Sequence, residues 1–503
     1  MKKYSDFTDE ISQADVYEGL LGYGLFSEKI PPILSSENFY NYCANNSPHF
    51  PDKWQPHIDY DSMRNTNVPR QLGIPNPMAY QKLCKCISDN WSAIQTYFRQ
   101  KSQGQQHIIG RIHLRRMADT KVLFKMNYEN WKTDGTPEPD LLIGSSFIVR
   151  ADISTCFPSI YTHSIPWALV GKSFAKDHAG SKWKGEWYNQ FDHCAQKCKN
   201  GETHGVLIGP HASNLIGEII LTSVDNELAK NWKYVRHIDD YTCFVKTREE
   251  AQLFLTELSE ALRKYDLSLN HKKTEIAELP TALTEQWIRQ IGNPALFFRD
   301  SIMDYIGVRT YLDSAIEIMQ KNKENTAILN YAIKALPVSK LSRNAASYTI
   351  KTVLHLCLLY PYLLQIVDEY IFERFHVPVD EIKCFSELVY DQELKSKNYD
   401  GVCHALYFAL KYNFLIEATK AQDAEKSDSC MFRLMAFLYF KKNGIKAERA
   451  QLRQLALTLK KNDYDFGKNW LFVYEVLPQS DLPGDWKALK TNGISFLKKE
   501  YQI

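Results

Sequence analysis

The 503-residue chain lacks several features that would assign it to a specialised class of protein. No apolar run approaches the ~18 residues that cross a membrane. The start, MKKYSDFTDE, has no apolar stretch after its two lysines, as a secretory signal would. The 11 cysteines are an odd number without a paired framework, which is typical of reduced thiols in the cytosol. We therefore expect a cytoplasmic protein that does not contact a membrane.

The chain also lacks a strong charge of either sign. Its 61 basic and 59 acidic residues give a net charge of +2, far from the basic balance of a dedicated nucleic-acid binder. One local surplus of basic residues interrupts this balance, either as a solvated charged face or as a surface that contacts phosphates. Its members are Arg99, Lys101, Arg111, Arg115, Arg116, Lys121 and Lys125, with Asp119 as the only acid among them.

The length and patterning predict three units: 1–145, 146–310 and 311–503. In the first, a helix is expected from about Met78, followed by strand-like pieces IIGRIHL and KVLFKM and by a loop, WKTDGTPEPD. In the last, strand signals vanish and amphipathic helical stretches follow one another without a fixed repeat period. Large apolar residues there are either plain core or an interface, Trp470, Phe472 and Tyr474 among them.

The middle unit reads as a small antiparallel sheet backed by helices, so the fold class is α+β. SSFIVRAD predicts a buried strand that ends at Asp152, and Pro158 suits the first turn of the helix expected after it. Apolar residues at spacings of three and four predict a helix over 212–228. Thr247 and Glu250 form a capping box before another helix, and LSLNHKKTEIAEL closes the unit as a strand.

The segment VRHIDDYTCFVKT, residues 235–247, predicts a hairpin with Asp239 and Asp240 at its tip. Acidic residues suit exposed turns, and an isolated pair would need no further explanation. If the strand that ends at Asp152 lies beside the hairpin, however, three carboxylates converge at one edge of the sheet. Two Mg²⁺ ions about 3.5 to 4 Å apart would neutralise such a cluster and clamp the oxygens of a phosphoryl displacement.

Four segments of the middle unit resemble motifs A to D of a reverse-transcriptase palm. They are ADISTCFPSIYTHSIPW, HGVLIGPHASNLIGE, RHIDDYTCF and LSLNHKKTE, in this order. YTHSIPW after motif A, LLGYGLFSEKIPP near the start and the helical end of the chain narrow the resemblance to the bacterial abortive-infection reverse transcriptases. The resemblance implies fingers and palm followed by an irregular, HEAT-like helical domain.

The resemblance also assigns roles to particular residues. Asp152, the backbone carbonyl of Ile153, Asp239 and Asp240 would be the metal ligands, with Asp152, Asp239 and Asp240 as the catalytic carboxylates. Phe157 falls where an aromatic ring excludes a ribose 2′-hydroxyl, unless it is a core residue. The other residues expected to bind nucleotide are Gly209, Ser213 and Lys273, and Lys273 would protonate the leaving pyrophosphate unless it is an ordinary solvated lysine.

Contact with nucleic acid is expected of a second set of residues. Arg70 lies in PRQLGIPNPMAY, which looks like the early fingers motif of the same enzymes. His237 stands where motif C usually starts with Tyr or Phe, and it would pack near the primer end. The remaining members come from the basic surplus and are Arg111, Arg115 and Arg116.

Motif B departs from the common pattern as well. Leu207 and Ile208 stand where Pro and Gln usually precede the glycine. An apolar residue at 208 cannot make the amide contacts that help to read a templated base pair. This departure agrees with the abortive-infection group, whose members look template-independent and start DNA synthesis on a protein tyrosine.

The resulting hypothesis is a phage-defence DNA polymerase that joins dNTPs with two Mg²⁺ ions, for which Mn²⁺ may substitute. Its DNA product would be attached to the protein, and the chain would form a homo-oligomer, a trimer or hexamer, as family members do. Two alternatives stay open: an inactive palm that serves as a scaffold beside a helical partner-binding module, and a conventional RNA-templated reverse transcriptase or RNA polymerase.

Overall fold

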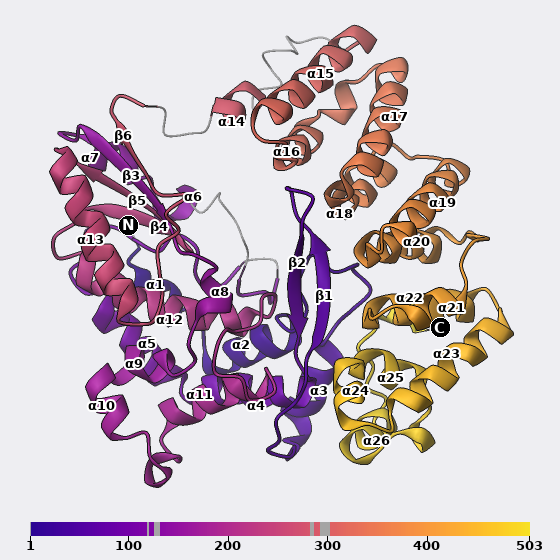
Figure 1. The fold of residues 1–503 in the computed structure, drawn as a ribbon, viewed down its shortest axis with the longest axis horizontal. Helices are drawn as coiled ribbons and strands as arrows, with labels where there is room; N and C mark the ends of the chain where they lie inside the picture. The colour runs from indigo at the N-terminus through magenta and orange to yellow at the C-terminus, as the bar shows by residue number, and fades with distance from the viewer. Residues whose placement is uncertain (1, 118–119, 125–130, 282–285, 292–301, 503) are drawn as a thin grey trace.

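The computed structural model describes residues 2–117, 120–124, 131–281, 286–291 and 302–502. Two small antiparallel sheets backed by helices are followed by an all-helical region that extends to the end of the chain (Figure 1). The predicted α+β fold class is therefore confirmed. None of the helices in the described ranges has the length and apolar character needed to cross a bilayer.

The larger sheet has four antiparallel strands in the order β4-β5-β3-β6. Their bounds are β3 Phe147–Asp152, β4 Tyr234–His237, β5 Asp240–Val245 and β6 Glu275–Glu278. Strand β3 is central, and its apolar residues Ile148, Val149 and Ala151 are almost completely buried, as expected of a strand covered on both faces. Leu141, Ile148, Val235 and Phe244 form a small apolar cluster of their own.

Two long helices pack beside this sheet, α12 (His211–Leu228) and α13 (Arg248–Arg263). The apolar residues that predicted α12 are all buried. Helix α13 begins in the predicted capping box, in which Glu250 N–H donates to Thr247 Oγ1 over 3.2 Å and Thr247 N–H donates to the Glu250 carboxylate over 3.3 Å. Both helices are therefore confirmed.

Some local predictions were wrong. IIGRIHL makes only one β-bridge, from Gly110 to Arg236, and no strand. KVLFKM lies partly outside the described residues, and its residues 121–124 form no strand. The predicted loop 131–140 contains two short helices, α6 (Trp131–Asp134) and the start of α7 (Glu138–Leu142). Proline is tolerated in the first turn of α7, because that turn does not need the missing N–H.

Other predictions held with different bounds. The helix expected from Met78 is two helices, α4 (Pro77–Asp89) and α5 (Trp91–Lys101). The helix expected around Pro158 is α8 (Cys156–Ser159), followed after a break by α9 (Ser164–Val170). The remaining helices of the first two units are α1 Tyr4–Asp9, α2 Gln13–Tyr17, α3 Glu37–Asn46, α10 Lys172–Asp177 and α11 Trp187–Lys197, with a π-helical turn at Glu18–Gly22.

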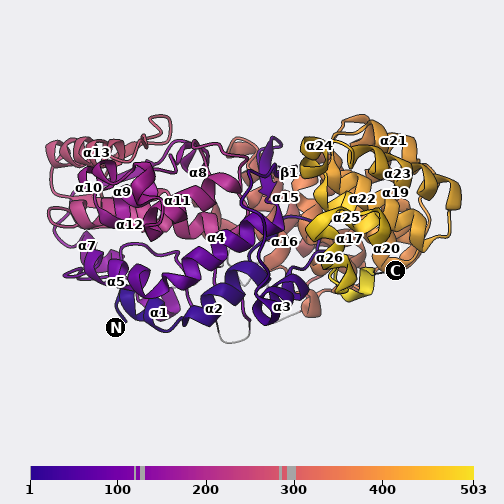
Figure 2. The ribbon, with the colours of Figure 1, turned by 90° about the horizontal axis from the view of Figure 1, so that it is seen from below.

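Helices α1, α2 and α3 lie along one edge of the molecule (Figure 2). The segment directly before α3 is joined to the far end of the chain, since Ser35 N–H donates to the Phe496 carbonyl over 2.8 Å and Lys498 N–H donates to the Ile33 carbonyl over 2.9 Å. The two ends of the chain are therefore held together by backbone hydrogen bonds.

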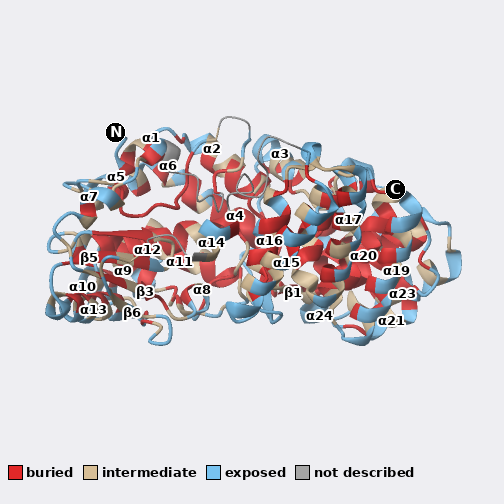
Figure 3. Cartoon of the chain, turned by 90° about the horizontal axis from the view of Figure 1, so that it is seen from above, coloured by how far each residue is buried: buried red, intermediate tan, exposed pale blue. Residues whose placement is uncertain are grey.

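The helical region consists of short and medium helices that pack on their neighbours in sequence. Their bounds are α14 Gln286–Ile291, α15 Tyr305–Lys321, α16 Ala327–Ala335, α17 Arg343–Leu359, α18 Leu364–Val367, α19 Val379–Lys395, α20 Tyr399–Tyr412, α21 Ala421–Lys426, α22 Cys430–Lys442, α23 Lys446–Leu459, α24 Asp463–Lys468, α25 Trp470–Val476 and α26 Gly484–Thr491. Helices α20 and α22 are its most buried part, and α20 is seen as a buried helix in Figure 3. Trp470, Phe472 and Tyr474 are fully buried core, so they do not supply an interface.

The smaller sheet was not predicted from the sequence. It is a hairpin of β1 (Ile58–Met63) and β2 (Pro69–Ile74) that lies between the four-stranded sheet and the helical region (Figure 1). The helical region holds this hairpin by polar contacts. Asp400 accepts a hydrogen bond from Met63 N–H over 2.9 Å and another from the Tyr60 hydroxyl. Lys468 Nζ lies 2.6 Å from Asp59 Oδ2.

Replacement of Asp400 by alanine should destabilise the protein and loosen the hairpin. It would leave the Met63 N–H and the Tyr60 hydroxyl without their acceptor in the interior, at a cost of about 1 to 3 kcal/mol for each unsatisfied group. Thermal unfolding and amide hydrogen exchange across residues 58–74 measure the effect. Asp391→Ala, at an exposed position of α19, is the matched control. Unchanged exchange in the hairpin of Asp400→Ala would contradict this account.

Candidate active site

The sheet brings three carboxylates to one edge. The register of β3 and β5 pairs Asp152 with Asp240, at the last residue of one strand and the first of the other. Beside them, the carbonyl of Asp239 accepts a hydrogen bond from Ile153 N–H over 3.1 Å. The convergence expected from the hairpin sequence is therefore present in the structure.

The three carboxylates lie close enough for the charge of one to change the pKa of another. Burial, and then the neighbouring Asp239 and Asp152, raise the pKa of Asp240 to about 7. Burial and the charge of Asp152 likewise raise the pKa of Asp239. Two groups stabilise the charge of Asp152: Lys273 Nζ lies 2.7 Å from Oδ2, and Asn270 Nδ2 donates to Oδ1 over 3.0 Å. The hydrogen bond to Asp152 raises the pKa of Lys273.

The expected metal site is not preassembled. In the described part of the chain, no three His, Cys, Asp or Glu side chains are grouped as a metal-ligand set. The Lys273 ammonium lies against Asp152, and Asp240 is protonated below a pH of about 7, so positive charge and a proton already offset the carboxylates. The donor set nevertheless fits magnesium, because it consists of carboxylate oxygens so close together that Asp152 raises the pKa of both Asp239 and Asp240. Asp152, Asp239, Asp240 and the Ile153 carbonyl would hold the ions.

The carboxylates line a cavity of about 840 Å³ between the palm and the β1–β2 hairpin. Ile153, Phe157, Gly209, Lys273, Arg70 and His237 also line it. Three further cations of its lining were missed in the sequence, namely Lys29, Arg64 and Lys199. Burial and the positive charges of the nearby Arg70 and Arg64 lower the pKa of Lys29. Lys29, Arg64 and Arg70 therefore lie close together in the lining. The cavity thus combines carboxylates that suit metal ions with cations that suit phosphates.

Residues 68–310 match the family model described as reverse transcriptase (RNA-dependent DNA polymerase). This part of the chain is a reverse-transcriptase domain. Its fold is that of a nucleotidyltransferase, and enzymes with this domain generally use divalent metal ions.

Telomerases are among the solved structures to which the chain is similar. Apo telomerase from Candida tropicalis aligns with 13% identity and a TM-score of 0.33, over 76% of this chain and 70% of that one. Telomerase from Candida albicans in complex with a telomeric RNA fragment aligns with 10% identity and a TM-score of 0.27, over 72% of this chain and 67% of that one. No curated protein matches the chain.

Two glycines fit the backbone of the reverse-transcriptase domain closely where it forms the cavity. Gly209 has a φ of +124°, which disfavours other residues, and a Cβ there would lie 3.3 Å from Ser27 Cβ. Gly73 N–H donates to the Ile208 carbonyl over 2.9 Å, so motif B lies directly on β2. Ser213 is buried in the first turn of α12 and does not line the cavity, where its neighbour Asn214 lies instead.

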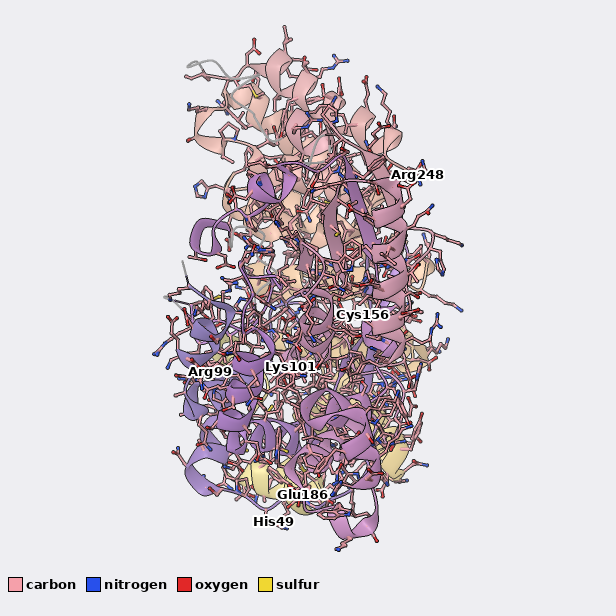
Figure 4. All side chains as sticks on the ribbon, turned by 90° about the vertical axis from the view of Figure 1, so that its left-hand side faces the viewer. His49, Arg99, Lys101, Cys156, Glu186 and Arg248 are labelled. Atoms are coloured by element: carbon pink, nitrogen blue, oxygen red, sulfur yellow. The ribbon has the colours of Figure 1, made fainter. Side chains whose placement is uncertain are left out.

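None of the described members of the basic surplus of 99–125 lines the cavity, and Lys125 lies outside the described residues. Arg111 and Arg115 are only 3% and 8% exposed. Arg115 Nη2 lies 3.0 Å from the buried Asp134 and Arg111 donates to the Gly135 carbonyl, so neither is placed for a phosphate to reach. Arg116 is exposed, and its contact with nucleic acid stays a prediction. Arg99, labelled with Lys101 in Figure 4, lies well away from the cavity residue Cys156.

Metal binding by the reverse-transcriptase domain should depend on pH. Because the folded pKa of Asp240 is about 7, a proton competes with the cation below that pH. The half-saturating Mn²⁺ concentration should fall by up to about tenfold between about pH 6 and pH 7 and level off near pH 8. Titration of free Mn²⁺ by electron paramagnetic resonance measures this. Asp240→Asn, which cannot titrate, should give a flatter curve, and a wild-type affinity independent of pH would refute the coupling.

Proposed function

We propose that the chain is a template-independent DNA polymerase that starts synthesis on one of its own tyrosines and acts in an abortive-infection defence against phage. The observation that carries the nucleotidyl-transfer part is the cavity in which Asp152, Asp239 and Asp240 face the cations Lys29 and Arg70. That arrangement suits a metal-bound dNTP, since metal ions bind carboxylates and cations bind the triphosphate.

Each part of the cavity has a task in this proposal. Asp152, Asp239 and Asp240 hold two Mg²⁺ ions, which supply Lewis-acid stabilisation of the transferring phosphoryl group when bound. Lys29, Arg64 and Arg70 attract the triphosphate. Lys273, whose ammonium touches Asp152 and which lines the same cavity, would donate a proton to the departing pyrophosphate.

The motif B segment is the part of the site that supports template independence. Leu207 and Ile208 both line the cavity, and a Cβ on Gly73 would meet the Leu207 side chain at 2.7 Å. These side chains offer no donor or acceptor to the edge of a base pair, so the pocket lacks one means of selecting a templated nucleotide. Protein priming, the attached DNA product and the trimer or hexamer rest on the resemblance of the motifs alone. The cytoplasmic location rests on the cysteine pattern and on the lack of a secretory signal in the sequence.

Substitution of both hairpin carboxylates, Asp239→Ala with Asp240→Ala, should abolish DNA synthesis. Loss of the metal ligands removes several kcal/mol of transition-state stabilisation, so a rate decrease on the order of 10³-fold or more is expected. The purified protein is incubated with Mg²⁺ or Mn²⁺ and labelled dNTPs, without template or primer, and analysed on a denaturing gel. Asp177→Ala, on the exposed face of α10, is the matched control.

The labelling pattern separates the candidate functions. Label that stays with the wild-type protein and is absent from the double variant supports protein-primed, template-independent synthesis. Incorporation only after a primed RNA template is added would favour a conventional reverse transcriptase, as the name of the matching family suggests. Absence of incorporation under both conditions would favour the scaffold.

Phe157→Val should admit ribonucleotides. Phe157 lines the cavity, and its ring packs beside Gly217 of α12, 3.5 Å from where a Cβ on that glycine would lie. Removal of the ring should raise incorporation of rNTPs relative to dNTPs by roughly 10- to 200-fold, as expected when a steric block worth about 1 to 3 kcal/mol is relieved. Competition between labelled rNTPs and dNTPs measures the ratio. An unchanged ratio with normal dNTP incorporation would assign Phe157 to packing alone.

A further inference from the structure

Arg236 is a completely buried arginine on β4, the first strand of the motif C hairpin. Its guanidinium is surrounded by two carboxylates of α12. Nη1 and Nη2 lie 3.0 Å from the two oxygens of Glu218, and Nη2 and Nε lie 2.7 and 2.9 Å from Asp225 Oδ2. A buried cation with two carboxylates is costly to desolvate, so it suggests a role beyond stability.

The network continues on both sides of the carboxylates. The Tyr4 hydroxyl donates to Glu218 Oε1 over 2.8 Å, and the Tyr234 hydroxyl donates to Asp225 Oδ1 over 2.9 Å. Both tyrosines are buried. The backbone of Arg236 is fixed as well, because its N–H donates to the Ile109 carbonyl over 2.8 Å and its carbonyl accepts from Arg111 N–H over 2.8 Å. The guanidinium is therefore held in one place and one orientation.

One donor of this guanidinium points to the hairpin tip. Arg236 Nη1 donates to the carbonyl of Ile238 over 2.9 Å. Ile238 has a φ of +58°, a left-handed conformation that is unfavourable for a β-branched residue. Its carbonyl belongs to the peptide bond that leads directly into Asp239. The hydrogen bond therefore fixes the plane of the peptide from which the Asp239 carboxylate projects into the cavity.

We propose that Arg236 is a positioning residue for catalysis: it holds the strained Ile238 peptide so that Asp239 faces Asp152 across the metal site. The inference rests on the proposed nucleotidyl transfer. A planar guanidinium can reach Glu218, Asp225 and the Ile238 carbonyl together, because its five donors lie in a rigid fork. Lysine keeps the charge and loses that geometry.

The test compares Arg236→Lys with Tyr4→Phe. Arg236→Lys should lower kcat by roughly 10- to 100-fold, the effect expected of a small displacement of a reacting group, with the KM for dNTP unchanged. It should also raise the half-saturating Mn²⁺ concentration and increase amide exchange at residues 237–240. Tyr4→Phe removes a hydrogen bond from the same network without touching the hairpin, and it should leave kcat and metal affinity as in the wild type.

A second variant, in which all three buried charges are replaced by neutral side chains, distinguishes loss of positioning from loss of folding. The triple variant Arg236→Met, Glu218→Gln, Asp225→Asn contains no unpaired buried charge, and it should fold with the same loss of kcat and of Mn²⁺ affinity. Wild-type kcat and Mn²⁺ affinity in this variant would overturn the proposal, as would equal losses in Tyr4→Phe and Arg236→Lys. If the wild type incorporates no nucleotide, the proposed function fails, whereas weaker Mn²⁺ binding and faster exchange in Arg236→Lys still support the positioning role.

Discussion

The pairing of Asp152 with Asp240 across β3 and β5 is the constraint on which the rest of the site depends. It places like charges side by side at a partly buried sheet edge, where their repulsion has to be offset. Burial raises the pKa of Asp240, and the neighbouring Asp239 and Asp152 raise it further. An antiparallel sheet does not otherwise favour two facing carboxylates, since like charges opposite each other destabilise a strand pair. A divalent cation is the group that turns this unfavourable pairing into a favourable one.

The helical region contributes to the site through the β1–β2 hairpin. Arg64 and Arg70 of that hairpin line the cavity. Asp400 and Lys468 of the helical region bind the hairpin through Met63 and Asp59. A two-stranded hairpin is at best marginally stable alone, so it needs packing against other elements to hold its side chains in place. The all-helical end of the chain is therefore part of the architecture of the active site and not a separate attachment.

The sequence predicted those parts of the fold that local patterns determine. The buried strand ending at Asp152, the spacing of apolar residues in α12 and the Thr247 capping box all held, because each depends on neighbours within a few residues. The β1–β2 hairpin was missed because its buried Tyr60 owes its place to Asp400, 340 positions away. Arg115 was expected at the surface and is buried, because its partner Asp134 comes from a segment whose prolines and glycine indicated a loop. Lys29 precedes the fingers motif in the sequence and yet lines the cavity. No local pattern could indicate that position, because it depends on the tertiary fold.

Two cations flank the hairpin tip, and they differ in a way that bears on mechanism. Arg236 is fully buried and bonded to two carboxylates and a backbone carbonyl, so it cannot leave without exposing uncompensated charge. Lys273 is bound to Asp152 through an ammonium on a flexible stem, and its side chain is 65% exposed. Moving Lys273 away from Asp152 would therefore cost little, whereas Arg236 is fixed in place. The structure thus distinguishes a buried cation that fixes the backbone of the hairpin tip from an exposed one held on a flexible stem.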